Sequence, residues 1–321
     1  MRKDVSTFVT KCKVCQQSKS DSKKPAGMMG TQRLVTRPWQ MISIDLMGPL
    51  VRSSKGNKYL MVVVDTFTKY TLLYPLREAT AKSVARHMEE DVFMVYGVPE
   101  YVICDNGAEN IGEPLRVLLQ EFKVKTIFTP SRHPQANPTE RTNRTIGNML
   151  RAYVGENHRH WDAKIPQLGC ALRTAVHEVT GYSPTFLNFG RELRLSGEGY
   201  AVLHTEELPQ VNNVELHSQK LKSLQQIYVE VKEKLQKAYQ KNEKRYNLRR
   251  RSQEFKEGQE VLKRNFVQSD AVNFISSKLS PKFVGPYIIH KKISPVSYEL
   301  KQPNGKTVGV WHTSDLKPFY K

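Results

Sequence analysis

The order of the apolar segments between residues 39 and 154 constrains the fold of this chain more than any other feature. Three segments with the alternation typical of β-strands follow one another at short intervals: Met41–Leu46, Tyr59–Thr66 and Thr71–Leu76. Their short connections predict an antiparallel meander. Helices and two further strands then alternate: helix 80–96, strand 101–104, helix 113–122, strand 125–128 and helix 138–154. This order predicts an α/β fold.

Local signals place the ends of these helices. The Thr80 hydroxyl can cap the first helix, and Gly97 followed by Pro99 should end it. Pro138 suits the first turn of the third helix, because the first N–H groups of a helix have no partner within it.

The pattern changes after Pro209. Apolar residues recur there at alternating intervals of three and four: Leu221, Leu224, Tyr228, Val231, Leu235 and Ala238. Because this stripe spans fewer than three heptads, packing against the same protein explains it at least as well as dimerisation. Residues 254–321 alternate short β-type segments with glycine and proline breaks, which predicts a small β-barrel.

The charge of the chain is strongly positive and unevenly placed. The 321 residues include 50 Lys and Arg against 31 Asp and Glu, a net charge of +19. Residues 1–25 hold seven basic and two acidic side chains and residues 215–321 hold 22 and 10, so the middle is nearly neutral. This distribution favours a polyanionic partner, nucleic acid or an acidic membrane surface, for the two ends. Charge that serves only solubility is the alternative.

Several classes of protein are not indicated. The apolar run Leu60–Val64 ends at Asp65, far short of the roughly 20 residues of a membrane span. We expect no secretory signal in residues 1–20, which have no apolar stretch. Four cysteines do not suffice for a disulfide framework, so a reducing compartment is expected.

Three carboxylates stand at the ends of predicted elements. Asp45 lies at the end of the first strand, Asp105 follows the fourth, and Glu140 opens the third helix. Phosphodiester transfer requires that the negative charge on the pentacovalent phosphate be neutralised and that an oxygen nucleophile be activated. Two Mg²⁺ ions about 4 Å apart do both. Hard cations take oxygen ligands, so the three carboxylates fit such a site. Each also has a structural explanation, as a strand-end cap, a turn former or a partner of a helix dipole.

The sequence around these carboxylates resembles the integrases of Gypsy-type LTR retrotransposons and, more distantly, those of retroviruses. The resemblance lies in three blocks, Ile44–Pro49, Cys104–Gly107 and His133–Arg144. It implies an RNase H-like catalytic core with a mixed five-stranded sheet, followed by a helical linker and a small SH3-like β-barrel.

The same resemblance implies a polynucleotidyl transferase, which could also cut DNA. Asp45, Asp105 and Glu140 would bind Mg²⁺ or Mn²⁺, and the enzyme would join the 3′ ends of element DNA to a target duplex. Joining two DNA ends needs at least two protomers, so a homo-oligomer is expected. The DNA substrate implies the nucleus, and no membrane partner is expected.

Both ends of the chain extend the resemblance. Cys12 and Cys15 look like the second half of an amino-terminal zinc module. No histidine precedes His87, so Zn²⁺ is expected only if a longer chain supplies the two missing ligands. Lys278–Tyr287 and Trp311–Pro318 resemble the Gly-Pro-Tyr module that closes these integrases. We therefore expect four segments: a zinc-module remnant at 1–25, the core at 35–195, a basic helical linker at 196–252 and a DNA-binding barrel at 253–321.

Basic residues near the carboxylates and in the linker are candidates for phosphate contact. Arg144 and Arg151 share a helix face with Glu140. Gly147 stands on that face where relatives often carry lysine, and a glycine inside a helix costs about 1 kcal/mol. The run 241–251 adds five more candidates: Lys244, Arg245, Arg249, Arg250 and Arg251.

Two other functions compete with strand transfer. An integrase-derived host protein that binds DNA or a protein without catalysis is favoured by the missing histidines and opposed by the three carboxylates. A plain RNase H-type nuclease would share the metals, but it gives no reason for the basic barrel.

Overall fold

The computed structural model describes residues 2–19, 23–30, 33–129, 139–193, 195, 214–270, 274 and 276–320. The chain divides into two compact units, each with its own five-stranded sheet. The larger unit holds residues 33–129 and 134–239, and the smaller unit joins the two ends of the chain, 1–32 and 240–321. None of the helices in the described ranges is long and apolar enough to cross a membrane.

The larger unit is built on a mixed sheet with the strand order β3-β2-β1-β4-β5. Its strands are β1 (Met41–Met47), β2 (Tyr59–Asp65), β3 (Thr71–Leu76), β4 (Tyr101–Cys104) and β5 (Lys125–Phe128). The first three strands pair antiparallel, whereas β4 runs parallel to both β1 and β5. The predicted meander and the mixed five-stranded sheet are therefore confirmed.

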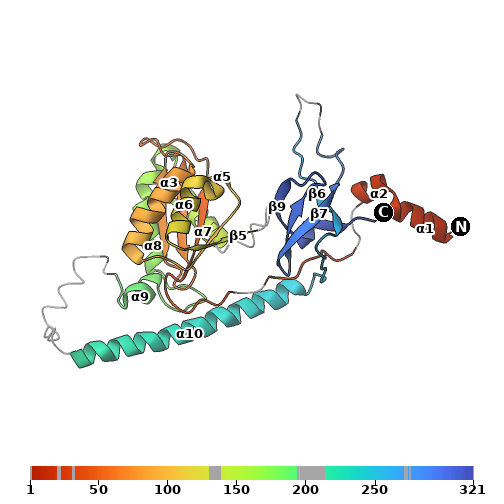
Figure 1. Cartoon of the computed structure of the whole chain (residues 1–321). Coiled ribbons are helices and arrows are strands. Elements are labelled where there is room, and N and C mark those ends of the chain that lie inside the picture. Colours follow the sequence, from red (N-terminus) through yellow and green to blue (C-terminus); the bar gives the residue numbers. More distant parts are fainter. Residues whose placement is uncertain are drawn as a thin grey trace. The chain divides into compact units, whose positions relative to one another are not determined.

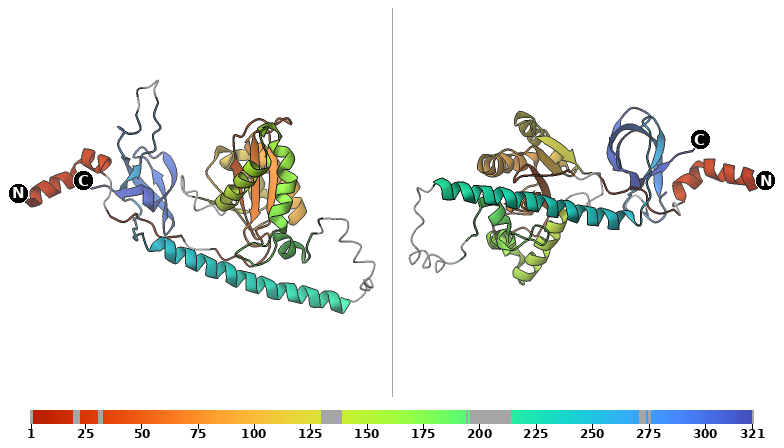
Figure 2. Two further views of the ribbon diagram at one scale, coloured as in Figure 1. Left: turned by 180° about the vertical axis from the view of Figure 1, so that it is seen from behind. Right: turned by 90° about the horizontal axis from the view of Figure 1, so that it is seen from below.

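Helices cover both faces of this sheet. On one face α3 (Ala81–His87) and α6 (Glu113–Glu121) pack on the inward residues of β1 and β2, such as Ile42 and Val63 (Figure 1). The other face carries α7 (Thr139–Tyr153), the 3₁₀ helix 158–164 and α8 (Ile165–Thr174), seen in green from behind in Figure 2. The unit also contains two short helices, α5 (Ala108–Ile111) and α9 (Pro184–Phe189).

The helix expected over 80–96 begins and ends as predicted but is not regular. The Thr80 hydroxyl accepts a hydrogen bond of 3.2 Å from the Ser83 N–H, and Gly97 ends the helix with a φ of +90°. Between α3 and α4 (Met94–Tyr96) the chain forms a π-helical turn over Met88–Phe93. A π turn is wider than an α turn, and here it lets the adjacent Val92 and Phe93 both reach the core.

The long helix α10 (Val214–Asn247) carries the apolar stripe that the sequence shows. Val231 is fully buried against Phe67 and Leu187 of the larger unit, and Tyr228 donates to the Leu187 carbonyl oxygen at 2.8 Å. The stripe therefore packs on its own protein over residues 227–235. The stretch 214–239 of the expected linker belongs to the larger unit, and the four expected segments otherwise stay a prediction.

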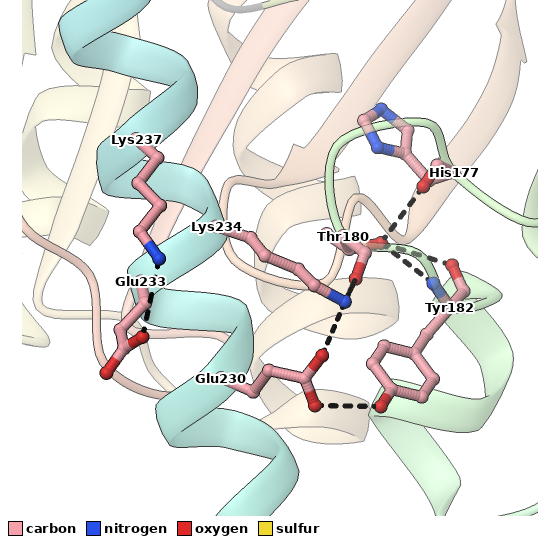
Figure 3. Close-up of polar contacts among 7 residues, drawn as sticks. All are labelled: His177, Thr180, Tyr182, Glu230, Glu233, Lys234 and Lys237. Atoms are coloured by element: carbon pink, nitrogen blue, oxygen red, sulfur yellow. Dashed lines mark hydrogen bonds and ion pairs between the residues drawn. The ribbon is translucent and has the colours of Figure 1, made fainter.

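Polar contacts reinforce this packing (Figure 3). The Glu230 carboxylate accepts from the Tyr182 hydroxyl at 3.0 Å and pairs with Lys234 of the next helical turn. The Lys234 ammonium also donates to the Thr180 carbonyl oxygen at 3.2 Å and lies over the Tyr182 ring. These contacts tie α10 to the loop before α9.

The smaller unit contains an antiparallel sheet with the strand order β10-β6-β7-β8-β9. Its strands are β6 (Glu260–Arg264), β7 (Phe283–Ser294), β8 (Ser297–Lys301), β9 (Thr307–His312) and β10 (Leu316–Pro318). The core of this sheet includes Val261, Ile289, Tyr298 and Trp311, all buried. The small SH3-like β-barrel is confirmed as a fold.

The amino-terminal helices α1 (Arg2–Lys11) and α2 (Lys13–Ser18) belong to this smaller unit. The Gln16 side chain is 5% exposed, and its amide donates to the Tyr320 carbonyl oxygen at 2.8 Å. The same amide accepts from the Tyr320 N–H at 2.9 Å. The Lys317 ammonium donates to the Gln16 carbonyl oxygen at 3.1 Å. A segment from the start of the chain is thereby fastened to its last described strand.

Candidate active site

Asp45 and Asp105 lie at the same edge of the sheet of the larger unit. Asp45 belongs to β1 and Asp105 directly follows β4. These strands are adjacent and parallel, with Ser43 opposite Ile103, so the same register continued by two residues places Asp45 beside Asp105. Asp45 faces the side of the sheet that α7 covers. Two of the three predicted metal ligands are thus brought together.

The surroundings of Asp45 disfavour its negative charge. Burial, then the charge of Asp105, and more weakly that of Glu109, raise the pKa of Asp45 from 3.8 to about 6. Hydrogen bonds from the Leu46 N–H (3.0 Å) and from Asn143 (2.6 Å) oppose this shift. No basic side chain in the described ranges forms an ion pair with Asp45 or Asp105. The pair therefore carries negative charge that lacks a balancing cation among these residues.

Asn143 connects α7 to this pair. Its amide nitrogen donates to Asp45 Oδ2 at 2.6 Å, and its amide oxygen is buried without a hydrogen-bond partner in the described structure. Glu140 lies one helical turn earlier in α7, and its side chain is outside the described residues. Residues three apart share a helix face, so the α7 backbone places Glu140 on the side from which Asn143 reaches Asp45.

Asp105 is held by donors from the residues that follow it. Its Oδ1 atom accepts from the Gly107 N–H at 2.9 Å and from the Asn110 amide nitrogen at 2.6 Å. Asn110 is 2% exposed, and its amide oxygen is likewise buried without a partner among the described atoms. Both bonds fix the direction of the Asp105 carboxylate while leaving its other oxygen, Oδ2, outside them.

Sequence reasoning missed both asparagines. Asn143 could have been found from its position three residues after Glu140. Asn110 gave no comparable signal, because it lies five positions after Asp105 and only the turn into α5 brings its side chain back to that carboxylate.

The oxygen atoms at this edge fit a hard divalent cation. Two partly buried carboxylates repel each other, both are oriented by amide donors, and oxygen is the ligand that Mg²⁺ and Mn²⁺ prefer. The described side chains contain no group of three His, Cys, Asp or Glu that could hold a metal. The third expected ligand, Glu140, is not among those side chains.

Cys104 stands next to this site without being a nucleophile. It is fully buried, and burial together with the charges of Asp105 and Glu109 raises its pKa to about 12. The thiol therefore stays protonated at neutral pH.

The predicted phosphate contacts fall into two groups. Arg144 and Arg151 are exposed on α7, and exposed basic residues also stand at the end of α10 and just after it: Lys244, Arg245 and Arg249. Arg250 and Arg251 have partners within the smaller unit. The Arg250 guanidinium lies 4.4 Å from the centre of the Tyr246 ring, and the Arg251 guanidinium donates to the Lys24 carbonyl oxygen at 3.0 Å. These two side chains help to hold residues 24–26.

Cys12, between α1 and α2, and Cys15, within α2, are free thiols. Hydrogen bonds from Cys15 lower the pKa of Cys12. Zinc binding by this pair stays a prediction.

Comparison with known proteins places both units. Residues 35–134 match the integrase core domain, and residues 258–320 match the Tf2-1-like SH3 domain. The Tf2-3 and Tf2-4 transposon polyproteins of Schizosaccharomyces pombe are each 28% identical over 99% of this chain, which spans 23% of their length. A chain in the structure of the simian T-cell lymphotropic virus intasome with PP2A regulatory subunit B56 gamma shares the fold. Its TM-score is 0.57 and its identity 12%, over all of this chain and 92% of that one.

Proposed function

From its relation to the integrases of Gypsy-type LTR retrotransposons, we propose that this chain joins DNA 3′ ends to a target duplex. The observation that carries the proposal is the pair Asp45 and Asp105, which lie at one sheet edge and repel each other. A chain that only bound DNA or a protein would have no use for this repulsion. The reaction is a transesterification. The 3′ hydroxyl of the joined DNA loses its proton and bonds to a target phosphorus, while the bond from that phosphorus to the target's own 3′ oxygen breaks and this oxygen takes up a proton as it leaves.

The carboxylates and the asparagines of the site would have different roles. Asp45, Asp105 and Glu140 would hold Mg²⁺ or Mn²⁺, and Asn143 and Asn110 would keep the two aspartates in their directions. When bound, such ions activate the attacking hydroxyl and neutralise charge on the phosphate. Removal of either aspartate should therefore abolish joining and any accompanying cleavage of DNA.

DNA would be gripped mainly through its phosphates. Arg144 and Arg151 extend from the helix that carries Glu140, and Lys244, Arg245 and Arg249 are exposed near the end of α10. Arg250 and Arg251 contribute instead by holding the segment around Ala26. We further propose that the protein acts as a homo-oligomer, because two DNA ends must be joined together, and that it acts in the nucleus, where the target duplex is.

The test is a joining assay with labelled DNA ends, a supercoiled plasmid and Mg²⁺ or Mn²⁺. The Asp45→Asn variant should lose joined product entirely, whereas the exposed Glu178→Gln variant should join at the wild-type level. Chelation with EDTA should also stop the wild-type reaction.

Two results would contradict the proposal. Labelled ends that are cut but never joined would favour the plain nuclease. Equal behaviour of wild type and Asp45→Asn, with intact DNA binding, would favour the non-catalytic descendant.

A further inference from the structure

A basic pocket of about 350 Å³ lies in the larger unit, outside the carboxylate site. Its charged lining consists of four exposed side chains: Arg52, Lys55, Arg77 and Arg159. Arg52 and Lys55 belong to the loop between β1 and β2, Arg77 directly follows β3, and Arg159 lies in the 3₁₀ helix 158–164. Three segments that are distant in the sequence thus bring cations to one hollow.

Hydrogen bonds fix the loop that lines this pocket with residues 52–56. The Ser53 hydroxyl donates to the Asp162 carboxylate at 2.6 Å, and the Asn57 amide donates to the same oxygen at 2.8 Å. The Ser54 N–H donates to the Arg159 carbonyl oxygen at 2.9 Å. Burial alone would raise the pKa of Asp162, but these two donors, together with the charge of Lys55 and a backbone hydrogen bond, lower the pKa below its ordinary value, so Asp162 is ionised. This carboxylate oxygen accepts hydrogen bonds from the loop, and its charge partly offsets that of Lys55.

The four basic side chains of the pocket are not neutralised by ion pairs. None of Arg52, Lys55, Arg77 and Arg159 forms an ion pair with a residue in the described ranges. Two guanidinium groups converge on Gly56: a Cβ atom there would lie 3.6 Å from Arg77 Nε and 4.0 Å from Arg52 Nη2. Like charges brought this close favour an anion between them.

The kind of anion follows from the donors that the pocket offers. The loop N–H groups are already used, because those of Lys55 and Asn57 donate to the Ser53 hydroxyl and that of Gly56 to the Ser53 carbonyl oxygen. Sites for free phosphate commonly use backbone N–H groups, whereas duplex backbones are contacted by exposed Arg and Lys side chains.

The position of the pocket gives its occupant a role. β1 ends where this loop begins, and Leu76 of β3 pairs with Tyr59 at the start of β2. The pocket therefore lies at the same edge of the sheet as Asp45 and Asp105, displaced toward β2 and β3. We propose that it binds a backbone phosphate of the DNA that the carboxylate site acts on. This inference rests on the proposed function, since it assigns that DNA a second point of contact.

The experiment measures DNA binding separately from chemistry. The full chain binds a short labelled duplex in EDTA, and fluorescence anisotropy gives the affinity over a series of NaCl concentrations. The test variant is Arg52→Gln with Arg77→Gln, and the matched control is Lys82→Gln with Arg191→Gln, two exposed cations outside the pocket. Loss of two phosphate contacts should weaken binding about tenfold at physiological salt and lower the salt slope by about 1.8. The control should change both quantities much less.

A second arm identifies the source of the phosphate. Inorganic pyrophosphate is titrated into the wild type and the test variant by calorimetry. Absence of binding, together with the weakened DNA affinity, supports the inference. Tight pyrophosphate binding that the variant loses, with unchanged DNA affinity, would overturn it in favour of a free polyphosphate ligand.

Other outcomes separate this inference from the proposed function. If the test variant and the control bind DNA equally, the pocket assignment is wrong even where Asp45→Asn abolishes joining. If the variant weakens DNA binding but the wild type never joins DNA, the phosphate contact stands and the proposed reaction fails. Thermal unfolding should show no lower midpoint for the test variant, because both arginines are exposed and repel each other.

Discussion

Asp45→Asn should stabilise the larger unit while abolishing its proposed chemistry. In the wild type the Asp45 pKa rises from 3.8 in the unfolded chain to about 6 in the folded one. The folded state therefore binds a proton more tightly, and stability falls as the pH rises through 6. At one pKa unit per 1.36 kcal/mol, ionisation of Asp45 costs the fold about 3 kcal/mol at pH 8, which is an upper value because the side chain is only partly buried.

The expected advantage of the variant depends on pH. At pH 5 Asp45 is mostly protonated in the folded wild type, so its raised pKa lowers the free energy of unfolding by only about 1.6 kcal/mol. The free energy of unfolding of Asp45→Asn minus that of the wild type should therefore be about 1.4 kcal/mol larger at pH 8 than at pH 5. Asparagine keeps an oxygen that can accept from Asn143, so this contact should survive the substitution.

The assay is urea unfolding in EDTA at both pH values, read by hydrogen exchange of peptides from β1 and β4. This readout reports on the larger unit alone. Asp162→Asn serves as a control of opposite sign. Burial raises the pKa of Asp162, but the donors Ser53 and Asn57, the charge of Lys55 and a backbone hydrogen bond together lower it, so loss of this carboxylate should destabilise the unit at pH 8. An Asp45→Asn variant that is no more stable than the wild type at pH 8, or equally shifted at both pH values, would refute the reasoning.

Three further substitutions test separate parts of the structure. Gly147→Ala should raise the free energy of unfolding by about 1 kcal/mol in urea titration, because the new Cβ would meet Met47 and Arg151 only at 4.0 Å. Asn110→Ala should lower DNA joining at least about tenfold with little change in the thermal midpoint, because it removes a donor to Asp105 together with an unpaired buried oxygen. Gln16→Ala should speed hydrogen exchange at the Tyr320 amide, because it removes the acceptor of that N–H. Unchanged exchange would show that this hydrogen bond does not protect the amide.

Much of the fold could be predicted because its signals are local. All five strands of the larger unit lie where alternation and turn residues placed them, and the Thr80 cap forms as predicted. The π-helical turn at Met88 was not predictable, since it depends on how two neighbouring side chains fit a sheet that the helix meets only after folding. The apolar stripe of α10 was predicted, but its partner depended on tertiary packing around Val231.

The positions of two carboxylates could be predicted, but the residues that orient them were not. Asp45 and Asp105 lie at neighbouring strand ends, where alternation and motif blocks placed them, and their role as metal ligands stays a prediction. The position of Asn143, three residues after Glu140, marks it as a candidate, but the residue that it contacts lies 98 positions away and no local pattern indicates that partner. The same holds for the pocket, where Arg77 and Arg159 meet only because the sheet and the 3₁₀ helix bring them together.

The hydrogen bonds between Gln16 and Tyr320 can form only late in the synthesis of these 321 residues. The two residues are 304 positions apart, so a ribosome releases one half of the contact long before it makes the other. At a translation rate of about 5–20 residues per second, α2 waits on the order of tens of seconds for its partner. The larger unit can fold during that interval, whereas the sheet of the smaller unit is complete only after β10 has emerged. While residues 17–319 are being made, α2 therefore lacks the Tyr320 backbone groups that Gln16 contacts in the folded unit.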